Sequence, residues 1–224
     1  MLQILEPSLD SKQFGCRRER STTHALVAMT HAWQTEMDQG GVVCALFVDF
    51  KKAFDLVNHN ILLHKLLNRK VPHCLIKWFF SYLNQRYKRV CKSNNCSAWL
   101  SLNGAMPQGS WLGPLSFLVL IDDLHVDCLL HKYVDDTTLT ELLHYNGDQS
   151  DMQSFFQQLL SWAANNDMIA NFTKTKEMIL GPPSKTVYLT PLTVHLTPLS
   201  KDNGYIEQVN SFKLLQIFVF LEHL

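Results

Sequence analysis

A nearly unbroken apolar segment, residues 42–50, is the feature that most constrains how this chain can fold. Its length, its β-branched residues and the glycines before it are typical of a strand buried on both faces of a sheet. One acidic residue, Asp49, lies near its end. A carboxylate there costs on the order of several kcal/mol unless it is paired or binds a metal. Asp49 is therefore either a strand-end residue that caps the next helix or a functional residue.

Two further apolar runs, residues 128–134 and 137–142, meet at Asp135 and Asp136. This pattern predicts a tight β-hairpin with two acids at its turn. An ordinary polar turn is the alternative. Carboxylates from separate strands that converge at one point are what a pair of closely spaced divalent cations requires, so the two acidic segments together favour a metal site.

Periodicity, capping residues and turn residues predict the other elements. These are helices over 21–37 (capped by Ser21 or Thr22), 61–67, 75–83 and 115–124, a helix after a capping box at Ser150 and Gln153, and hairpins over 86–102 and from 204 onward.

The chain of 224 residues, 46% of them hydrophobic, is long enough to bury one substantial core. It contains no signal peptide and no apolar stretch long enough to span a bilayer, so we expect a soluble intracellular protein, nuclear or cytoplasmic, without a membrane partner. Its six cysteines are scattered, and we expect them to be reduced. A zinc site is disfavoured because Cys91 and Cys96 lack a second closely spaced ligand pair.

The formal net charge is zero, but the charges are unevenly distributed. Residues 56–121 contain no Asp or Glu. Their eight basic residues are Lys65, Arg69, Lys70, Lys77, Arg86, Lys88, Arg89 and Lys92. A solvated face is the simple interpretation of such a run. Because aromatic residues are interleaved with these bases, we expect a surface that faces a polyanion.

Five motifs occur in a defined order along the chain. They are Q-F-G-C-R-R-E-R-S-T (13–22), F-V-D-F-K-K-A-F-D (47–55), G-A-M-P-Q-G-S-W-L-G-P-L (104–115), Y-V-D-D (133–136) and N-F-T-K-T-K (171–176). This order and spacing resembles the reverse transcriptases of non-LTR (LINE-type) retrotransposons, over roughly residues 12–215. Asp122 departs from the pattern, because the family usually has Asn at this position.

The resemblance implies an α+β fold: a right-hand polymerase palm, which is an antiparallel sheet with packed helices, with partial fingers and the thumb missing. The implied regions are partial fingers (1–40), palm (41–58), a basic fingers/palm insertion (59–103), palm (104–204) and the start of a truncated primer-grip-like hairpin (205–224).

The resemblance also implies the metal ligands. Asp49, Asp135, Asp136 and the backbone carbonyl oxygen of Phe50 would hold two Mg²⁺ ions, with Mn²⁺ as an alternative. Lys174 would be a general acid or would neutralise charge on the pyrophosphate, although a surface lysine is a fair alternative.

The implied nucleotide-binding residues lie in three motifs. Phe54 would exclude a ribose 2′-hydroxyl, with plain core packing as the alternative. Gln108 and Gly109 would lie near the incoming nucleotide. Arg17 and Arg20 would reach the triphosphate or the template backbone, with a solvated surface role as the alternative.

The implied activity is RNA-directed DNA polymerisation, which extends a DNA primer on an RNA template with dNTPs. Two other interpretations stay open: a catalytically inactive, truncated transposable-element remnant or nucleic-acid-binding fragment, and an RNA-templated RNA polymerase or group II intron-like maturase. The oligomeric state is not predicted.

Overall fold

A five-stranded sheet forms the centre of the computed structural model, which describes residues 2–93, 95–102, 104–107, 109–110, 112–143, 150–181, 193–195 and 203–220. The strands are β1 (Val42–Val48), β6 (Leu129–Tyr133), β7 (Asp136–Leu143), β8 (Lys176–Leu180) and β11 (Glu207–Gln208), in the order β11-β8-β1-β7-β6. The β11 strand pairs parallel to β8, and the other pairings are antiparallel.

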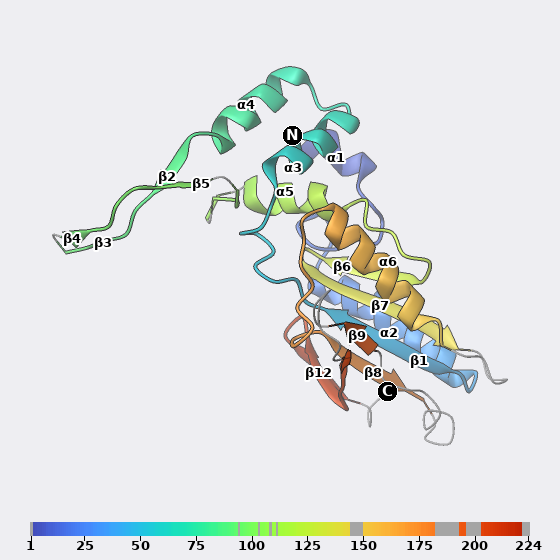
Figure 1. Cartoon of the computed structure of the whole chain (residues 1–224). Helices are drawn as coiled ribbons and strands as arrows, with labels where there is room; N and C mark the ends of the chain where they lie inside the picture. Colours follow the sequence, from blue (N-terminus) through green and yellow to red (C-terminus); the bar gives the residue numbers. More distant parts are fainter. Residues whose placement is uncertain are drawn as a thin grey trace.

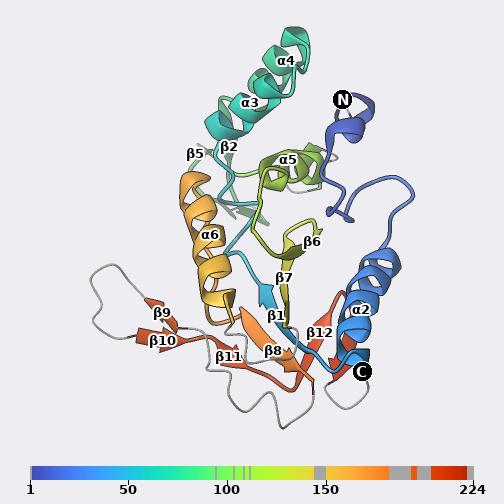
Figure 2. The same ribbon diagram turned by 90° about the vertical axis from the view of Figure 1, so that its right-hand side faces the viewer.

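The middle strand, β1, is buried along its whole length, as its apolar sequence predicted. It ends at Val48, two residues earlier than expected, so Asp49 lies just beyond the strand. The even-numbered residues of β1 pack in one hydrophobic cluster with α5 (Leu112–Ile121) and α6 (Met152–Asn165). The odd-numbered residues pack in a second cluster with α2 (Thr22–Asp38). Figure 2 shows α6 and α2 on opposite sides of the sheet.

A C-terminal hairpin of β12 (Ser211–Leu214) and β13 (Ile217–Phe220) contributes Leu214 and Val219 to the second cluster. The expected hairpin in this region is therefore confirmed. The other short elements are α1 (Leu2–Leu5), a 3-10 helix (Glu6–Ser8), β9 (Thr193–His195) and β10 (Asn203–Tyr205). Among the helices of the described ranges, none is both long and apolar enough to cross a membrane.

Capping residues define the starts of several helices. The Ser21 hydroxyl accepts a hydrogen bond from the His24 N–H at the start of α2, which confirms the predicted cap. Asn58 caps α3 (His59–Asn68) in the same way. The following helix, α4 (His73–Leu83), begins directly after Pro72.

Helices α3 and α4 each begin two residues before the predicted start, and the starts of α5 and α6 also differ from the prediction. Helix α5 begins at Leu112, three residues early, because Ser110 accepts a hydrogen bond from the Gly113 N–H through its hydroxyl and its carbonyl. At the start of α6, Ser150 accepts from the Met152 N–H but donates its own proton to Glu141 of β7. A carboxylate of the sheet therefore anchors the start of this helix.

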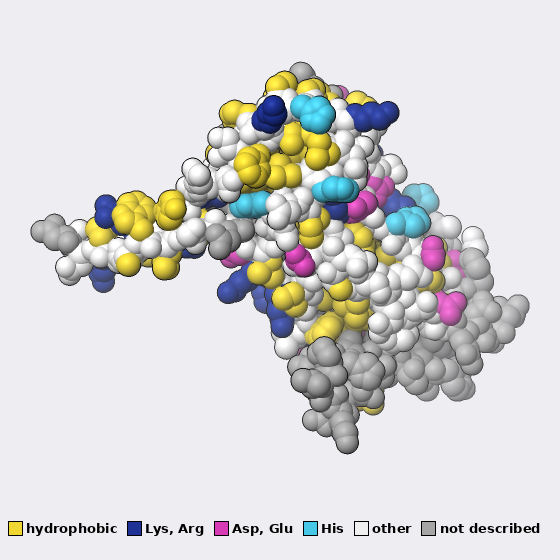
Figure 3. Space-filling view, turned by 45° about the horizontal axis from the view of Figure 1, so that its top comes forward, with side chains coloured by type: hydrophobic (Ala, Val, Ile, Leu, Met, Phe, Trp, Pro, Cys, Tyr) yellow, Lys and Arg dark blue, Asp and Glu magenta, His cyan; other side chains and the backbone are white. Residues whose placement is uncertain are grey.

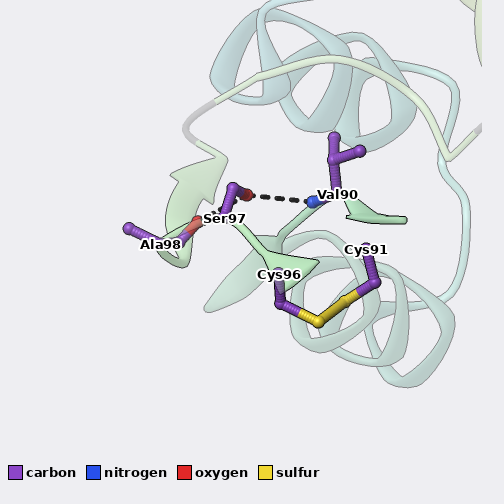
Figure 4. The surroundings of a disulfide bond; sticks show 5 residues. All are labelled: Val90, Cys91, Cys96, Ser97 and Ala98. Carbon is purple, nitrogen blue, oxygen red and sulfur yellow. Dashed lines mark hydrogen bonds between the residues drawn. A yellow bond between two sulfur atoms is a disulfide. The ribbon is translucent and has the colours of Figure 1, made fainter. Parts of the chain in front are cut away.

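A long β-ribbon, residues 86–102, projects from the body of the molecule and is called the arm below (Figure 1). It comprises β2 (Arg86–Lys88), β3 (Cys91–Lys92), β4 (Asn95–Cys96) and β5 (Leu100–Leu102), as the predicted hairpin implied. Cys91 and Cys96 are paired across the ribbon and form a disulfide (Figure 4). The expectation that all six cysteines are reduced is wrong for this pair, because strand pairing brings their Cα atoms to 4.1 Å.

A buried lysine connects the N-terminal segment to the sheet. The Lys132 side chain of β6 is inaccessible to solvent, and its ammonium group donates to the carbonyl oxygens of Ile121, Asp122 and Leu124 at the end of α5. It also forms an ion pair of 2.7 Å with Asp10. Asp122 accepts a hydrogen bond from the Asp10 N–H and forms an ion pair with Arg69. The acid at this position therefore has a structural role.

Candidate active site

Three aspartates gather where β1 ends and β7 begins. Val48 pairs with Thr137 in the β1–β7 register, so Asp49 follows β1 at the level where Asp136 opens β7. Asp136 pairs with Tyr133, which makes Val134 and Asp135 the two turn residues. The prediction placed the turn at Asp135–Asp136, one residue too far along the chain. The predicted hairpin is present, and Asp49 lies next to it.

The turn has an unusual backbone conformation. Val134 has φ 60°, a left-handed conformation that β-branched residues rarely adopt and that costs on the order of 1–3 kcal/mol. The side-chain oxygen of Gln13 accepts hydrogen bonds from the N–H groups of Val134 (3.1 Å) and Gly15 (2.8 Å). A Cβ atom at Gly15 would lie 2.5 Å from a Val134 methyl carbon, so only glycine fits against the turn.

Gln13 and Gly15 support the turn that carries Asp135, and neither position was predicted from the sequence. Both lie in the Q-F-G-C-R-R-E-R-S-T motif, in which only Arg17 and Arg20 were predicted to bind the nucleotide or the template. Gln13 is fully buried, but a glutamine followed two residues later by glycine indicates a turn support only when the position of Val134 in space is known.

The carboxylate of Asp49 is held by the N-F-T-K-T-K segment. The Asn171 side-chain amide donates to Asp49 Oδ2 at 2.8 Å, and the Asn171 N–H donates to the Asp49 carbonyl oxygen at 2.8 Å. The Asp49 N–H in turn donates to the Thr175 hydroxyl at 3.3 Å. These three bonds fix both the backbone and the side chain of Asp49. Asn171 and Thr175 were also missed from sequence, where only Lys174 of this motif was singled out.

The backbone at Phe50 leaves one oxygen available. Phe50 forms an isolated antiparallel bridge with Ala170. The hydrogen bonds of this bridge use the Asp49 carbonyl and the Lys51 N–H, not the carbonyl of Phe50. The Phe50 carbonyl oxygen is thus free of this bridge, as a metal ligand at this position requires.

Burial and neighbouring negative charges disfavour the ionised forms of Asp135 and Asp136. Partial burial, followed by the charges of Asp135 and Asp49, raises the pKa of Asp136 to about 6. Partial burial and the charge of Asp49 also raise the pKa of Asp135. Both shifts mean that ionised carboxylates are unfavourable here without a compensating cation.

A cleft of about 330 Å³ adjoins these acids, and Asp49, Asp136 and Lys174 all contribute to its lining. The Lys174 side chain is exposed within it, so the structure brings the predicted lysine together with two of the predicted aspartates. In the part of the chain that the structure describes, no three His, Cys, Asp or Glu side chains are grouped closely enough to hold a metal by themselves. The donor set is nevertheless hard oxygen, which suits Mg²⁺.

A second cleft, of about 440 Å³, is lined by Phe54 and Gly109 among others. The Phe54 ring is half-buried and packs on Phe117, with the ring centroids 4.9 Å apart. Gly109 has φ 78°, and a Cβ atom there would meet open space, so its backbone conformation favours glycine. Gln108, which was predicted to lie near the nucleotide, falls outside the described residues.

The two arginines of the first motif are engaged within the protein. Arg17 donates to the Asp10 carbonyl at 2.7 Å and pairs with Glu6 at 3.3 Å. Arg20 donates to the carbonyls of Ser11 and Gln13, and its guanidinium lies over the Phe14 ring. A contact from either arginine to a triphosphate would require these bonds to rearrange.

Comparison with known proteins identifies relatives along most of the chain. The family described as reverse transcriptase (RNA-dependent DNA polymerase) has a model that matches residues 1–215. The probable RNA-directed DNA polymerase from transposon BS of Drosophila melanogaster is 28% identical over 93% of this chain and 23% of its own length. The polymerase from the mobile element jockey of the same species is 28% identical over 72% of this chain and 19% of its own length. The chain therefore spans about a fifth to a quarter of these relatives.

Solved structures of telomerase from Candida tropicalis share the fold. The apo enzyme truncated from its C-terminal domain aligns with a TM-score of 0.57 at 13% identity, and the match covers 98% of this chain and 43% of that one. The enzyme in complex with the TWJ fragment of telomeric RNA also aligns with a TM-score of 0.57. At this identity the likeness concerns the fold alone.

Proposed function

The chain belongs to the reverse transcriptase family and has the α+β palm fold that its motifs implied, and on that premise we propose that it catalyses RNA-directed DNA synthesis. The reaction would extend a DNA primer on an RNA template with dNTPs. One observation carries the proposal: the end of β1 and the β6–β7 turn bring Asp49 beside Asp135 and Asp136. The chain spans only part of its relatives' length, so the proposed activity rests on the site of this chain.

The carboxylates of Asp49, Asp135 and Asp136 and the carbonyl oxygen of Phe50 would hold two Mg²⁺ ions, or Mn²⁺. The raised pKa values of Asp135 and Asp136 support this, since a bound cation would relieve the repulsion between them. When bound, such a pair supplies Lewis acidity at the primer 3′-hydroxyl and the leaving pyrophosphate.

Other residues are proposed to handle the nucleotide. Lys174 lines the same cleft as Asp49 and Asp136 and would neutralise or protonate the leaving pyrophosphate. Phe54 and Gly109 line one cleft and would surround the incoming sugar together with Gln108. The contacts of Arg17 and Arg20 within the protein support a structural role for both, and triphosphate binding would require these contacts to rearrange.

The proposed regions are those that the motifs implied: partial fingers (1–40), palm (41–58 and 104–204), a basic fingers/palm insertion (59–103) and a primer-grip-like hairpin (205–224). The partner is proposed to be nucleic acid, with RNA as template and DNA as primer.

The proposal is tested by dNTP incorporation on a primed RNA template with Mg²⁺ or Mn²⁺. We expect incorporation by the unmodified chain and its loss, by at least about 100-fold, in Asp135→Asn. Asp38→Asn, an exposed acid at the opposite end of β1, is the matched control and should retain activity. A folded chain that incorporates no nucleotide would support the inactive-remnant interpretation, and incorporation unaffected by Asp135→Asn would exclude the mechanism.

A further inference from the structure

One face of the arm displays aromatic and basic side chains together. Side chains of paired residues, and of residues two apart, lie on the same face of a ribbon. Tyr87 pairs with Ser101, and the guanidinium of Arg89 lies 4.5 Å from the centre of the Trp99 ring. Tyr87, Arg89 and Trp99 therefore share a face. Tyr87 and Trp99 are 60% and 59% exposed, so both rings are available to a ligand.

The arm carries basic residues that have no acidic partner in the part of the chain that the structure describes. Arg86, Lys88, Arg89 and Lys92 lie on it, and no acidic residue occurs between residues 56 and 121. Lys65 and Arg69, in the same acid-free segment, are paired with Asp123 and Asp122. The four bases of the arm form no ion pair with any residue in the described ranges. Figure 3 shows the arm covered with hydrophobic and basic side chains.

A cleft of about 330 Å³ opens at the base of the arm, where β2 and β5 meet α3 and α4. Tyr87, Asn60, Asn84 and Gln85, all of which are exposed, are among the residues that line it. Side-chain amides carry N–H donors beside a carbonyl acceptor, and such groups can pair with the edge of a nucleobase. The cleft therefore suits an unstacked nucleobase.

We propose that the arm and the cleft at its base bind single-stranded RNA outside the cleft of the aspartates. Tyr87 and Trp99 stack on bases, Lys88, Arg89 and Lys92 contact phosphates, and the amide-lined cleft receives one unstacked base. Exposed rings favour a single strand over a duplex, because stacking requires unpaired bases. The choice of RNA over other polyanions rests on the proposed function, in which this strand is the template.

The test is fluorescence anisotropy of a labelled, unstructured 15-nucleotide RNA with the whole chain, without primer, dNTP or divalent metal. Tyr87→Ala and Trp99→Ala should each raise Kd about 5- to 100-fold. Trp99→Phe, which keeps an aromatic face, should restore most of the affinity. The double variant Lys88→Ala, Arg89→Ala should lower the slope of log Kd against log salt by about 1.4, or 0.7 for each lost phosphate contact.

Val27→Ala is the control, because Val27 is 58% exposed and lies on α2, outside the arm. Its affinity should be unchanged. Equal Kd values for the parent, Tyr87→Ala and Trp99→Ala would overturn the site. The site would also be overturned if the arm variants bound RNA with the parent's Kd but sedimented as a smaller species than the parent. The arm would then be a contact between protein chains. The assay contains no polymerisation step, so a chain that binds RNA through the arm without incorporating dNTPs would contradict only the proposed function.

Discussion

The side-chain amide of Asn171 donates a 2.8 Å hydrogen bond to the carboxylate of Asp49, across 122 positions of the chain. The same segment holds the Asp49 backbone through the Asn171 N–H and the Thr175 hydroxyl. Asp49 therefore has one carboxylate oxygen fixed by protein and the other left for a ligand. Groups that orient a metal ligand in this way commonly affect metal affinity about 10- to 100-fold.

Asn171→Ala should raise the Mg²⁺ concentration for half-maximal dNTP incorporation about 10-fold or more, because Asp49 loses its orientation. Saturating Mg²⁺ should restore much of the rate. The control is Asn166→Ala, which removes a buried amide that donates only to the carbonyl of Trp162. An identical Mg²⁺ dependence in both variants would show that Asn171 does not position Asp49.

Asp136→Asn should stabilise the metal-free chain at neutral pH. The pKa of Asp136 is raised in the folded state to about 6 from 3.8, so the folded chain binds more protons between these values. Its free energy of unfolding must therefore fall as pH rises through this window. The variant should be more stable by about 1 kcal/mol at pH 7, a modest value because solvent screens this side chain, and equally stable at pH 4.

Urea unfolding in EDTA at several pH values measures this difference, with Asp38→Asn as the control at an exposed site. A stability difference that stays constant from pH 4 to pH 7 would rule out charge repulsion at Asp136.

Phe54→Val should increase the use of ribonucleotides relative to deoxynucleotides by about 10-fold or more, since a smaller side chain leaves room for a 2′-hydroxyl. The readout is the ratio of kcat/KM for the two substrates. Phe155→Val removes similar volume from a half-buried ring of α6 that packs against the same core cluster. If both variants keep the parent's selectivity, Phe54 is only a packing residue.

Lys132→Met should cost about 3–5 kcal/mol in the free energy of unfolding, because it leaves Asp10 and three carbonyl oxygens without their shared donor. The matched control is Lys176→Met, whose partner Glu207 is largely exposed. An exposed ion pair contributes at most about 1 kcal/mol. Similar losses in the two variants, measured by urea unfolding, would contradict the structural role of Lys132.

The double variant Cys91→Ser, Cys96→Ser should leave the free energy of unfolding of the body within about 0.5 kcal/mol of the parent, because the arm is an exposed projection. Tryptic cleavage at Lys88, Arg89 and Lys92 should nevertheless accelerate, since the tip loses its cross-link. Dithiothreitol should reproduce this acceleration in the parent and have no effect on the variant. A large drop in global stability would show that the arm and the body fold together.

Local patterns predicted the elements whose formation depends on neighbouring residues. The run before Asp49 predicted a strand buried on both faces, and Ser21 predicted the start of α2. The start of α5 was misplaced, because nearly all of its residues are buried and Ser110 sets the first turn. The pairing of Cys91 with Cys96 was missed, because it depends on the register of two strands.

The sequence by itself predicted the buried strand before Asp49 and the hairpin that carries Asp135 and Asp136, because hydrophobic patterns are local and linear properties. The palm fold was implied by the resemblance of five ordered motifs to a known family. Only the tertiary structure decided what holds those aspartates: Asn171 and Thr175 at Asp49, and Gln13 and Gly15 at Val134. It also decided that, among the described residues, the bases of the arm form no ion pair whereas Lys65 and Arg69 do. Hydrogen bonds and ion pairs depend on distance and direction in space, and residues more than a hundred positions apart meet only when the chain has folded.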